Sequence, residues 1–306
     1  MIHRLLVPGL LEAPPGGAAP RFPILERVIA RADEEPASGG LEQLLMRLFG
    51  LESRQGAAPF CYLADTGREP GTGVLRAHPV HLRADRDQVL LFPLDDSSLT
   101  MDEAQGLASR FNAHFSAHGL AMEVVAPHRW YLLTERLPET PFAALDQVAG
   151  RGLRSCLPGV DGDGFWLSVL NEIQMLFFDA PVNRNREETG RPPVNGLWLD
   201  GGGKLPSRPL SGPGKVQGDH CLLRGLSAST GKDNGEAVTV MTGIAGALRQ
   251  RNPSAWLQSM LALEAWLKAM IGKEEIVLYS CDGRGWHWKP SCNRRLWRLS
   301  RPLPWT

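Results

Sequence analysis

Strand-like and helix-like patterns alternate along this chain, and the alternation constrains its fold more than any other feature. Residues 4–7 form a short apolar run typical of a buried strand, and residues 22–32 and 41–51 carry apolar side chains at helical spacing. After residue 160, further helices and strands are predicted at 165–178, 196–199, 237–241 and 254–271, with a terminal hairpin at 276–289. This order predicts an α/β domain.

A module of a different kind interrupts that domain. Thr100 and Glu103 have the spacing of a helix capping box, and Gly119 is placed to end the helix that they begin. Strands, helix and strands are predicted in turn at residues 79–83, 88–92, 100–118, 121–125 and 130–134. We therefore expect a discontinuous α/β domain of residues 1–74 and 160–306, and an α+β insertion domain of residues 75–159.

Charge and cysteine content exclude several classes of protein. The chain has 33 Lys plus Arg against 33 Asp plus Glu, and this formal charge of zero argues against a protein that coats a nucleic acid, because such binding depends on a basic surface. Its apolar stretches are too short to span a bilayer, and its five cysteines form no CxxC pair. We expect a cytoplasmic protein with free thiols and with neither nucleic acid nor membrane as a partner.

Two polar segments are candidates for a ligand site. The segment 78–87 contains two His, two Arg and two Asp, among them Arg83 and Arg86. It is either an exposed turn laced with ion pairs or an anion site, because guanidinium groups match phosphate and carboxylate geometry. The segment 180–195 is either a helix stop and crossing loop whose Asn side chains bond backbone, or a polar ligand site.

The run PVNRNREETGRPPVNGLWLDGGGKLP (181–206) resembles a segment of the archaeal-type cofactor-independent phosphoglycerate mutases. With LRADRDQVLLFP (82–93) and RRLWRLSRPL (294–303), the whole chain resembles the bacterial RpfE-type regulatory proteins. The resemblance implies an alkaline-phosphatase-like sheet with helices on both faces. It also implies a small phosphorylated or carboxylate ligand. The candidate ligand contacts are Arg83, Arg86, Arg129, Asn183, Arg186, Asn195 and Asp200.

The chain departs from the mutase pattern where the metals would bind. In that family an Asp-Gly after the first strand supplies the first metal ligand and a serine is the nucleophile, whereas here Pro8 and Gly9 follow the strand. Proline has no side-chain donor for a metal. We therefore expect a catalytically degenerate, regulatory or ligand-sensing protein with no cofactor, and no catalytic residue is assigned.

Two alternatives remain open. One is an active metal-dependent phosphoglycerate mutase or phosphatase with two divalent metals such as manganese. Its candidate ligands are Asp200, Asp219, His220, Asp282 and His287. The other is a scaffold for a protein partner that uses the Trp- and Arg-rich segment 286–305, since Trp and Arg are enriched at interface hot spots. The same segment is equally explained by Arg stacked on Trp against the core.

Overall fold

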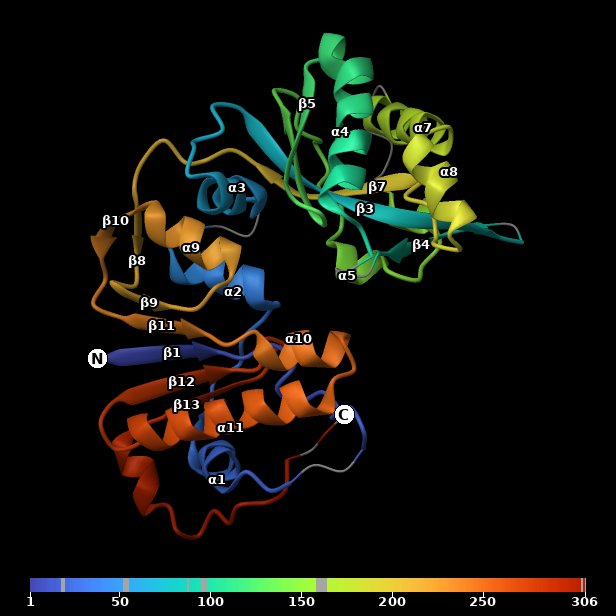
Figure 1. Cartoon of the computed structure of the whole chain (residues 1–306). Coiled ribbons are helices and arrows are strands. Elements are labelled where there is room, and N and C mark those ends of the chain that lie inside the picture. Colours follow the sequence, from blue (N-terminus) through green and yellow to red (C-terminus); the bar gives the residue numbers. More distant parts are fainter. Residues whose placement is uncertain are drawn as a thin grey trace. The chain divides into compact units, whose positions relative to one another are not determined.

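The computed structural model describes residues 1–17, 20–51, 55–86, 88–94, 98–157, 164–303 and 305 (Figure 1). The chain divides into two compact units. The first consists of residues 1–53 and 208–306, and the second of residues 54–207.

The first unit contains a six-stranded sheet with the order β2-β13-β12-β1-β11-β9. The strands β1, β11, β12 and β9 run parallel, while β13 pairs antiparallel with β12 and with β2. A separate parallel pair is formed by β8 and β10. The strands are β1 (Ile2–Leu6), β2 (Asp33–Glu34), β8 (Leu210–Gly212), β9 (Lys215–Gln217), β10 (Thr230–Asp233), β11 (Ala237–Val240), β12 (Glu275–Tyr279) and β13 (Gly285–Trp288).

Helices cover both faces of this sheet. The helices α1, α10 and α11 pack on one face, and α2 and α9 lie on the other (Figure 1). On the first face, Leu5, Leu278 and Trp288 of the strands share one core with Val28 of α1 and Leu263 of α11. The helical segments are α1 (Pro23–Arg31), α2 (Leu41–Leu48), α9 (Cys221–Ala228), α10 (Gly243–Arg249), α11 (Pro253–Met270) and the 3₁₀ turn η2 (Pro290–Arg294). The predicted α/β class, with helices on both faces of a sheet, is confirmed.

The second unit is organised around one long strand. β3 (Gly73–Asp85) pairs antiparallel with β4 (Gln88–Pro93), β6 (Arg129–Thr134) and β7 (Gly196–Gly203), and β5 (Leu120–Ala126) pairs with β6. The helical segments of this unit are α3 (Ala58–Thr66), α4 (Met101–Phe115), η1 (Ser116–His118), α5 (Leu145–Val148), α6 (Leu153–Cys156), α7 (Phe165–Phe178) and α8 (Pro181–Glu188). The predicted capping box is confirmed: Thr100 Oγ1 accepts from Glu103 N at 3.2 Å, and Glu103 Oε2 accepts from Thr100 N at 2.9 Å.

The second unit is larger than the predicted insertion domain of residues 75–159. Residues 160–207 were assigned by sequence to the first domain, but in the structure β7 pairs with β3. Ile173 and Phe177 of α7 also share a core with Phe111 of α4 and Trp130 of β6. Strand pairing and apolar burial thus associate this segment with the second unit, and α3 precedes β3 in the same unit.

Two local predictions are wrong. The segment 180–195, expected as a helix stop followed by a crossing loop, contains the helix α8. Pro181 ends α7 but suits the first turn of a new helix, where its missing N–H is not needed. The Gly- and Pro-rich stretch between the predicted strands 196–199 and 237–241, for which the sequence pattern predicts only a long loop, contains β8, β9, α9 and β10. None of the described helices combines the length and apolar character needed to cross a membrane.

Candidate functional site

The polar segment after α7 brings two of its predicted ligand contacts into the protein interior. Asn183, which is 2% exposed, donates from Nδ2 to the carbonyl oxygens of Phe177 (2.7 Å) and Val194 (2.8 Å). Its Oδ1 accepts from Val194 N at 2.8 Å. Asn183 therefore links the end of α7 to the segment before β7, and both of its N–H donors are used, so it has no donor left for an anion in this conformation.

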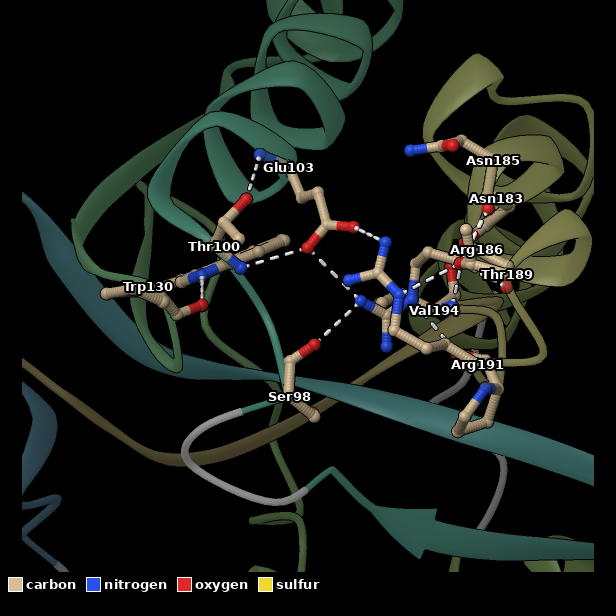
Figure 2. Close-up of polar contacts among 12 residues, drawn as sticks. Ser98, Thr100, Glu103, Trp130, Asn183, Asn185, Arg186, Thr189, Arg191 and Val194 are labelled. Carbon is tan, nitrogen blue, oxygen red and sulfur yellow. Dashed lines mark hydrogen bonds and ion pairs between the residues drawn. The ribbon is translucent and has the colours of Figure 1, made fainter.

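Arg186, which lies on α8 with Asn183, is fully buried and belongs to an ionic cluster with Glu103 and Arg191 (Figure 2). Arg186 Nη1 donates to Glu103 Oε2 at 3.2 Å and to the Ser98 carbonyl at 2.8 Å. Its Nε donates to the Pro192 carbonyl at 2.9 Å. Arg191 Nη2 lies 3.0 Å from Glu103 Oε1, so both carboxylate oxygens face a guanidinium group.

Glu103 stays ionised because its partners outweigh its burial. Desolvation on its own would raise the pKa of Glu103, but the Thr100 N–H, Arg186 and Arg191 together lower the pKa below its usual value. The N-terminus of α4 adds the favourable end of a helix dipole. The capping carboxylate of α4 is thus also the counter-ion of a buried arginine.

The cluster has more positive than negative charge and three buried polar atoms without a hydrogen bond. Two guanidinium groups face one carboxylate. Within the described part of the chain, Arg186 Nη2, Ser98 Oγ and Glu103 Oε1 are buried and have no hydrogen-bond partner, although Glu103 Oε1 keeps its ion pair with Arg191. The side chain of Arg191 is 37% exposed. A small anion bound beside Arg191 would balance this charge, since guanidinium groups bind phosphate and carboxylate in a bidentate manner.

Asp200 anchors a second buried ion pair. It is 2% exposed, and its Oδ1 lies 2.6 Å from Arg76 Nε and 3.1 Å from His78 Nε2. Its Oδ2 accepts from Leu145 N at 3.0 Å. Burial would raise the pKa of Asp200, but the charges and hydrogen bonds of Arg76 and His78 hold it well below its usual range. The carboxylate is engaged by three internal partners.

Asn195 is also engaged by the protein itself. Its Oδ1 accepts from Leu82 N at 2.6 Å, and its Nδ2 donates to the Leu82 carbonyl at 2.8 Å. The side chain thus continues the pairing of β3 with β7 one residue beyond the ladder, which ends at Gly196.

The other predicted ligand contacts lie at separate places on the sheet. Arg83 is exposed and its guanidinium stacks 4.7 Å from the Phe92 ring centroid, while Arg86 occupies the exposed turn between β3 and β4. Arg129 donates from Nη1 to both carboxylate oxygens of Asp65, at 3.0 and 3.2 Å. Ala77 of β3 pairs with Trp130, so Arg83 lies six residues, or roughly 20 Å, further along the strand.

The carboxyl edge of the parallel sheet, where α/β proteins commonly bind ligands, is poor in metal donors. After β1 the chain continues through Val7 into Pro8. After β12, Asp282 accepts from Ser280 Oγ and from Arg284 Nε, the latter at 3.0 Å. Desolvation would raise the pKa of Asp282, but these donors lower it, and its own hairpin holds the carboxylate.

The remaining candidate metal ligands lie on several elements, with His220 directly before α9. Asp219 is exposed after β9, whereas His287 lies in β13 between Glu275 (2.7 Å) and Glu35 (3.4 Å). Asp200 belongs to the second unit. Within the described ranges, no group of three or more His, Cys, Asp or Glu side chains is arranged to hold a metal ion. The donor set therefore does not fit a two-metal centre.

Sequence reasoning missed Glu103, Arg191, Ser98 and Arg76 as members of these clusters. Glu103 carried a signal, since its capping-box spacing placed it at the start of α4. Arg191 lies within the polar segment that we singled out, but nothing in the pattern distinguishes it from its neighbours. Arg76 and Ser98 gave no signal, because only the tertiary fold brings them to Asp200 and Arg186.

Comparison with known proteins adds a fold likeness. No protein-family model matches the chain, and no curated protein is similar to it in sequence. The PH0037 protein from Pyrococcus horikoshii superposes with a TM-score of 0.51 at 13% identity, over 90% of this chain and 81% of that one. A cofactor-independent phosphoglycerate mutase from Thermoplasma acidophilum gives a TM-score of 0.43 at 17% identity, over 99% and 93% of the two chains. The likeness to the Pyrococcus protein shows a shared fold and nothing finer.

Proposed function

We propose that this chain is a phosphoglycerate-mutase-like protein of the bacterial RpfE regulatory type, with an alkaline-phosphatase-like first unit. In this proposal it has lost the catalytic metal centre and senses a small phosphorylated or carboxylate ligand in the cytoplasm.

The observation that carries the proposal is Pro8, the second residue after β1. The sequence resemblance implies an aspartate there as the first metal ligand, but the chain has Pro8. The neighbouring edge residue Asp282 is held by Arg284 and Ser280. These residues at the carboxyl edge of the sheet support the proposal that the protein has the sheet of the family but not the ligands of its two-metal centre.

The Glu103–Arg186–Arg191 cluster supports the ligand-sensing part. It has an excess positive charge, an unpartnered guanidinium nitrogen and one half-exposed arginine, and both arginines contact Glu103, whose carboxylate caps α4. Helix N-termini and arginine forks are the elements with which proteins bind phosphate. An anion bound to Arg191 would compete with Glu103 for this guanidinium group. Because Glu103 caps α4, binding of the anion would change the interactions at the start of that helix.

Calorimetric titration with 2-phosphoglycerate, 3-phosphoglycerate and inorganic phosphate tests this proposal. We expect at least one of them to bind, and Arg191→Ala to weaken its affinity by about tenfold through loss of one charged hydrogen bond. Arg184→Ala is the matched control, because Arg184 is exposed on α8 and, among the described residues, its side chain pairs with Asp179 alone. Absence of heat at millimolar concentration of every ligand would reject the proposal.

A second candidate function, a scaffold for a protein partner, is favoured by one observation. Leu296, Trp297 and Leu299 near the C-terminus are 69%, 76% and 77% exposed. The interpretation that this whole segment packs on the core therefore holds for only part of it. Trp286, Trp288 and Leu303 are buried, and Trp305 packs on Trp256.

A further inference from the structure

The exposed apolar side chains Leu296, Trp297 and Leu299, here named the tail patch, lie on a segment that is held in place. Arg295 forms a two-pronged ion pair with Asp33 and donates to the Arg31 carbonyl. Arg298 Nη1 donates to the Ala32 carbonyl at 2.8 Å. Because α1 and its C-terminal residues fix the backbone, the tail patch is presented to solvent in an ordered segment and its docking would require little ordering of the chain.

The tail patch is surrounded by positive charge. Residues 283–306 contain six basic residues and no acidic residue. The formal charge of the chain is zero, so the other residues carry the compensating acidic excess. Pairing of two tail patches with each other would bring Arg294, Arg298 and Arg301 of two copies together, with Asp33, which already pairs with Arg295, as a neighbouring counter-ion, and this excess of like charge disfavours that arrangement. The complementary surface is therefore apolar and acidic.

The outer face of α7 has this chemistry. Leu167, Met175 and Phe178 are 43%, 76% and 80% exposed, and we name them the α7 patch. Glu172 precedes Met175 by three residues and Asp179 follows it by four, so both carboxylates neighbour Met175 on the helix surface. The helix α7 has no basic residue, although His114 of α4 lies 3.0 Å from Glu172, and Glu187 and Glu188 are exposed on α8. Arg184 is the one exposed basic residue of α7 and α8, and it pairs with Asp179.

From this complementarity we infer that the tail patch of one copy of the chain docks on the α7 patch of a second copy. The contact is heterologous, since two different surfaces meet, and it can therefore propagate beyond a dimer. Three exposed side chains supply an area on the order of a few hundred Å², below the roughly 800 Å² per partner of a standard interface. We therefore expect association in the micromolar range that weakens as salt is raised.

Analytical ultracentrifugation over a concentration series tests the inference with the full chain. The wild type is expected to associate, and Trp297→Ala and Met175→Lys are each expected to weaken association by about thirtyfold or more, as for an interface hot spot. Leu257→Ser and Leu261→Ser on α11 are the controls, because these leucines are also exposed (37% and 54%) but lie outside both patches. Circular dichroism of each variant verifies that it is folded.

Mixing the two defective variants gives the sharpest test. Trp297→Ala keeps an intact α7 patch and Met175→Lys keeps an intact tail patch, so a heterologous contact predicts a one-to-one complex in the mixture. A wild type that stays monomeric at the highest concentration would overturn the inference. Association that neither variant weakens would overturn it as well. Monomeric protein that binds phosphatidylserine vesicles through Trp297 would assign the tail patch to a lipid surface instead.

Discussion

Two ionic groups of the second unit are more deeply buried than an ion pair on the sheet of the first unit. In the second unit Arg186 and Asp200 are buried, and each is held by several partners. In the first unit Arg4 pairs with Glu236 on the sheet at 2.7 and 2.8 Å, with 19% and 21% of their side chains exposed. The Arg4–Glu236 pair is therefore partly screened by water, whereas Arg186 and Asp200 are 0% and 2% exposed. Removal of the partner is expected to cost more for a fully buried charge than for a partly exposed ion pair.

The largest expected effect comes from removing the charge of Glu103. Glu103→Gln leaves Arg186 buried without a counter-ion, which costs about 3–5 kcal/mol of unfolding free energy. Urea unfolding measures the loss. Glu172→Gln is the control, since Glu172 pairs with His114 at an exposed position and its substitution changes stability by less than about 1 kcal/mol. A loss of similar size in both variants would contradict the contrast between buried and exposed pairs.

Asp200→Asn is expected to cost about 2–4 kcal/mol, because Arg76, His78 and Leu145 N lose a charged acceptor. The effect depends on pH. The pKa of Asp200 is lowered on folding, so its contribution is present above the unfolded-state pKa of about 3.9 and is lost as pH falls below that value. Unfolding measured at neutral pH and near pH 3 should show the difference between wild type and Asp200→Asn shrinking. A difference that stays constant would refute this assignment.

The sequence predicts some of the elements on which these two predictions depend, but not all of them. Elements whose ends are marked by local residue patterns can be predicted from the sequence. The capping box at Thr100 and Glu103 predicts α4, and the apolar run at residues 4–7 predicts β1. The helix α8 was not predicted, because Pro181 resembles a stop although it equally begins a helix.

The site residues are likewise only partly predictable from the sequence. Arg186 and Asp200 are charged residues of the run 181–206, yet their partners Glu103 and Arg76 lie 83 and 124 residues away in the sequence. No local pattern encodes such pairs. The structure instead shows Asn183 and Asn195 bonding backbone groups, as the structural interpretation of that segment predicts.

Arg4→Ala tests the partly exposed ion pair of the first unit. The loss of two hydrogen bonds to Glu236 and one to Tyr279 Oη should cost about 1–2 kcal/mol, since these groups are half-buried. Desolvation raises the pKa of Tyr279 to about 12, and Arg4 lowers it in part. Ultraviolet titration of tyrosine should therefore show one tyrosine that ionises later still in the Arg4→Ala variant. An earlier ionisation would show that Arg4 does not act on Tyr279.

The smallest effect is expected at Arg83, one of the predicted ligand contacts. Its guanidinium stacks on Phe92 at an exposed position, so Arg83→Ala should change the unfolding free energy by about 0.5 kcal/mol or less. A change of several kcal/mol in the unfolding free energy would show that the Arg83–Phe92 contact stabilises the protein as much as the buried ion pairs do.

The most direct test of the account is a coupled enolase assay of the purified chain with manganese, run with and without a chelator. With Pro8 after β1 and Asp282 held by its own hairpin, the account predicts no chelator-sensitive conversion of 3-phosphoglycerate. Measurable turnover that the chelator abolishes would contradict it and would identify the chain as an active metal-dependent mutase.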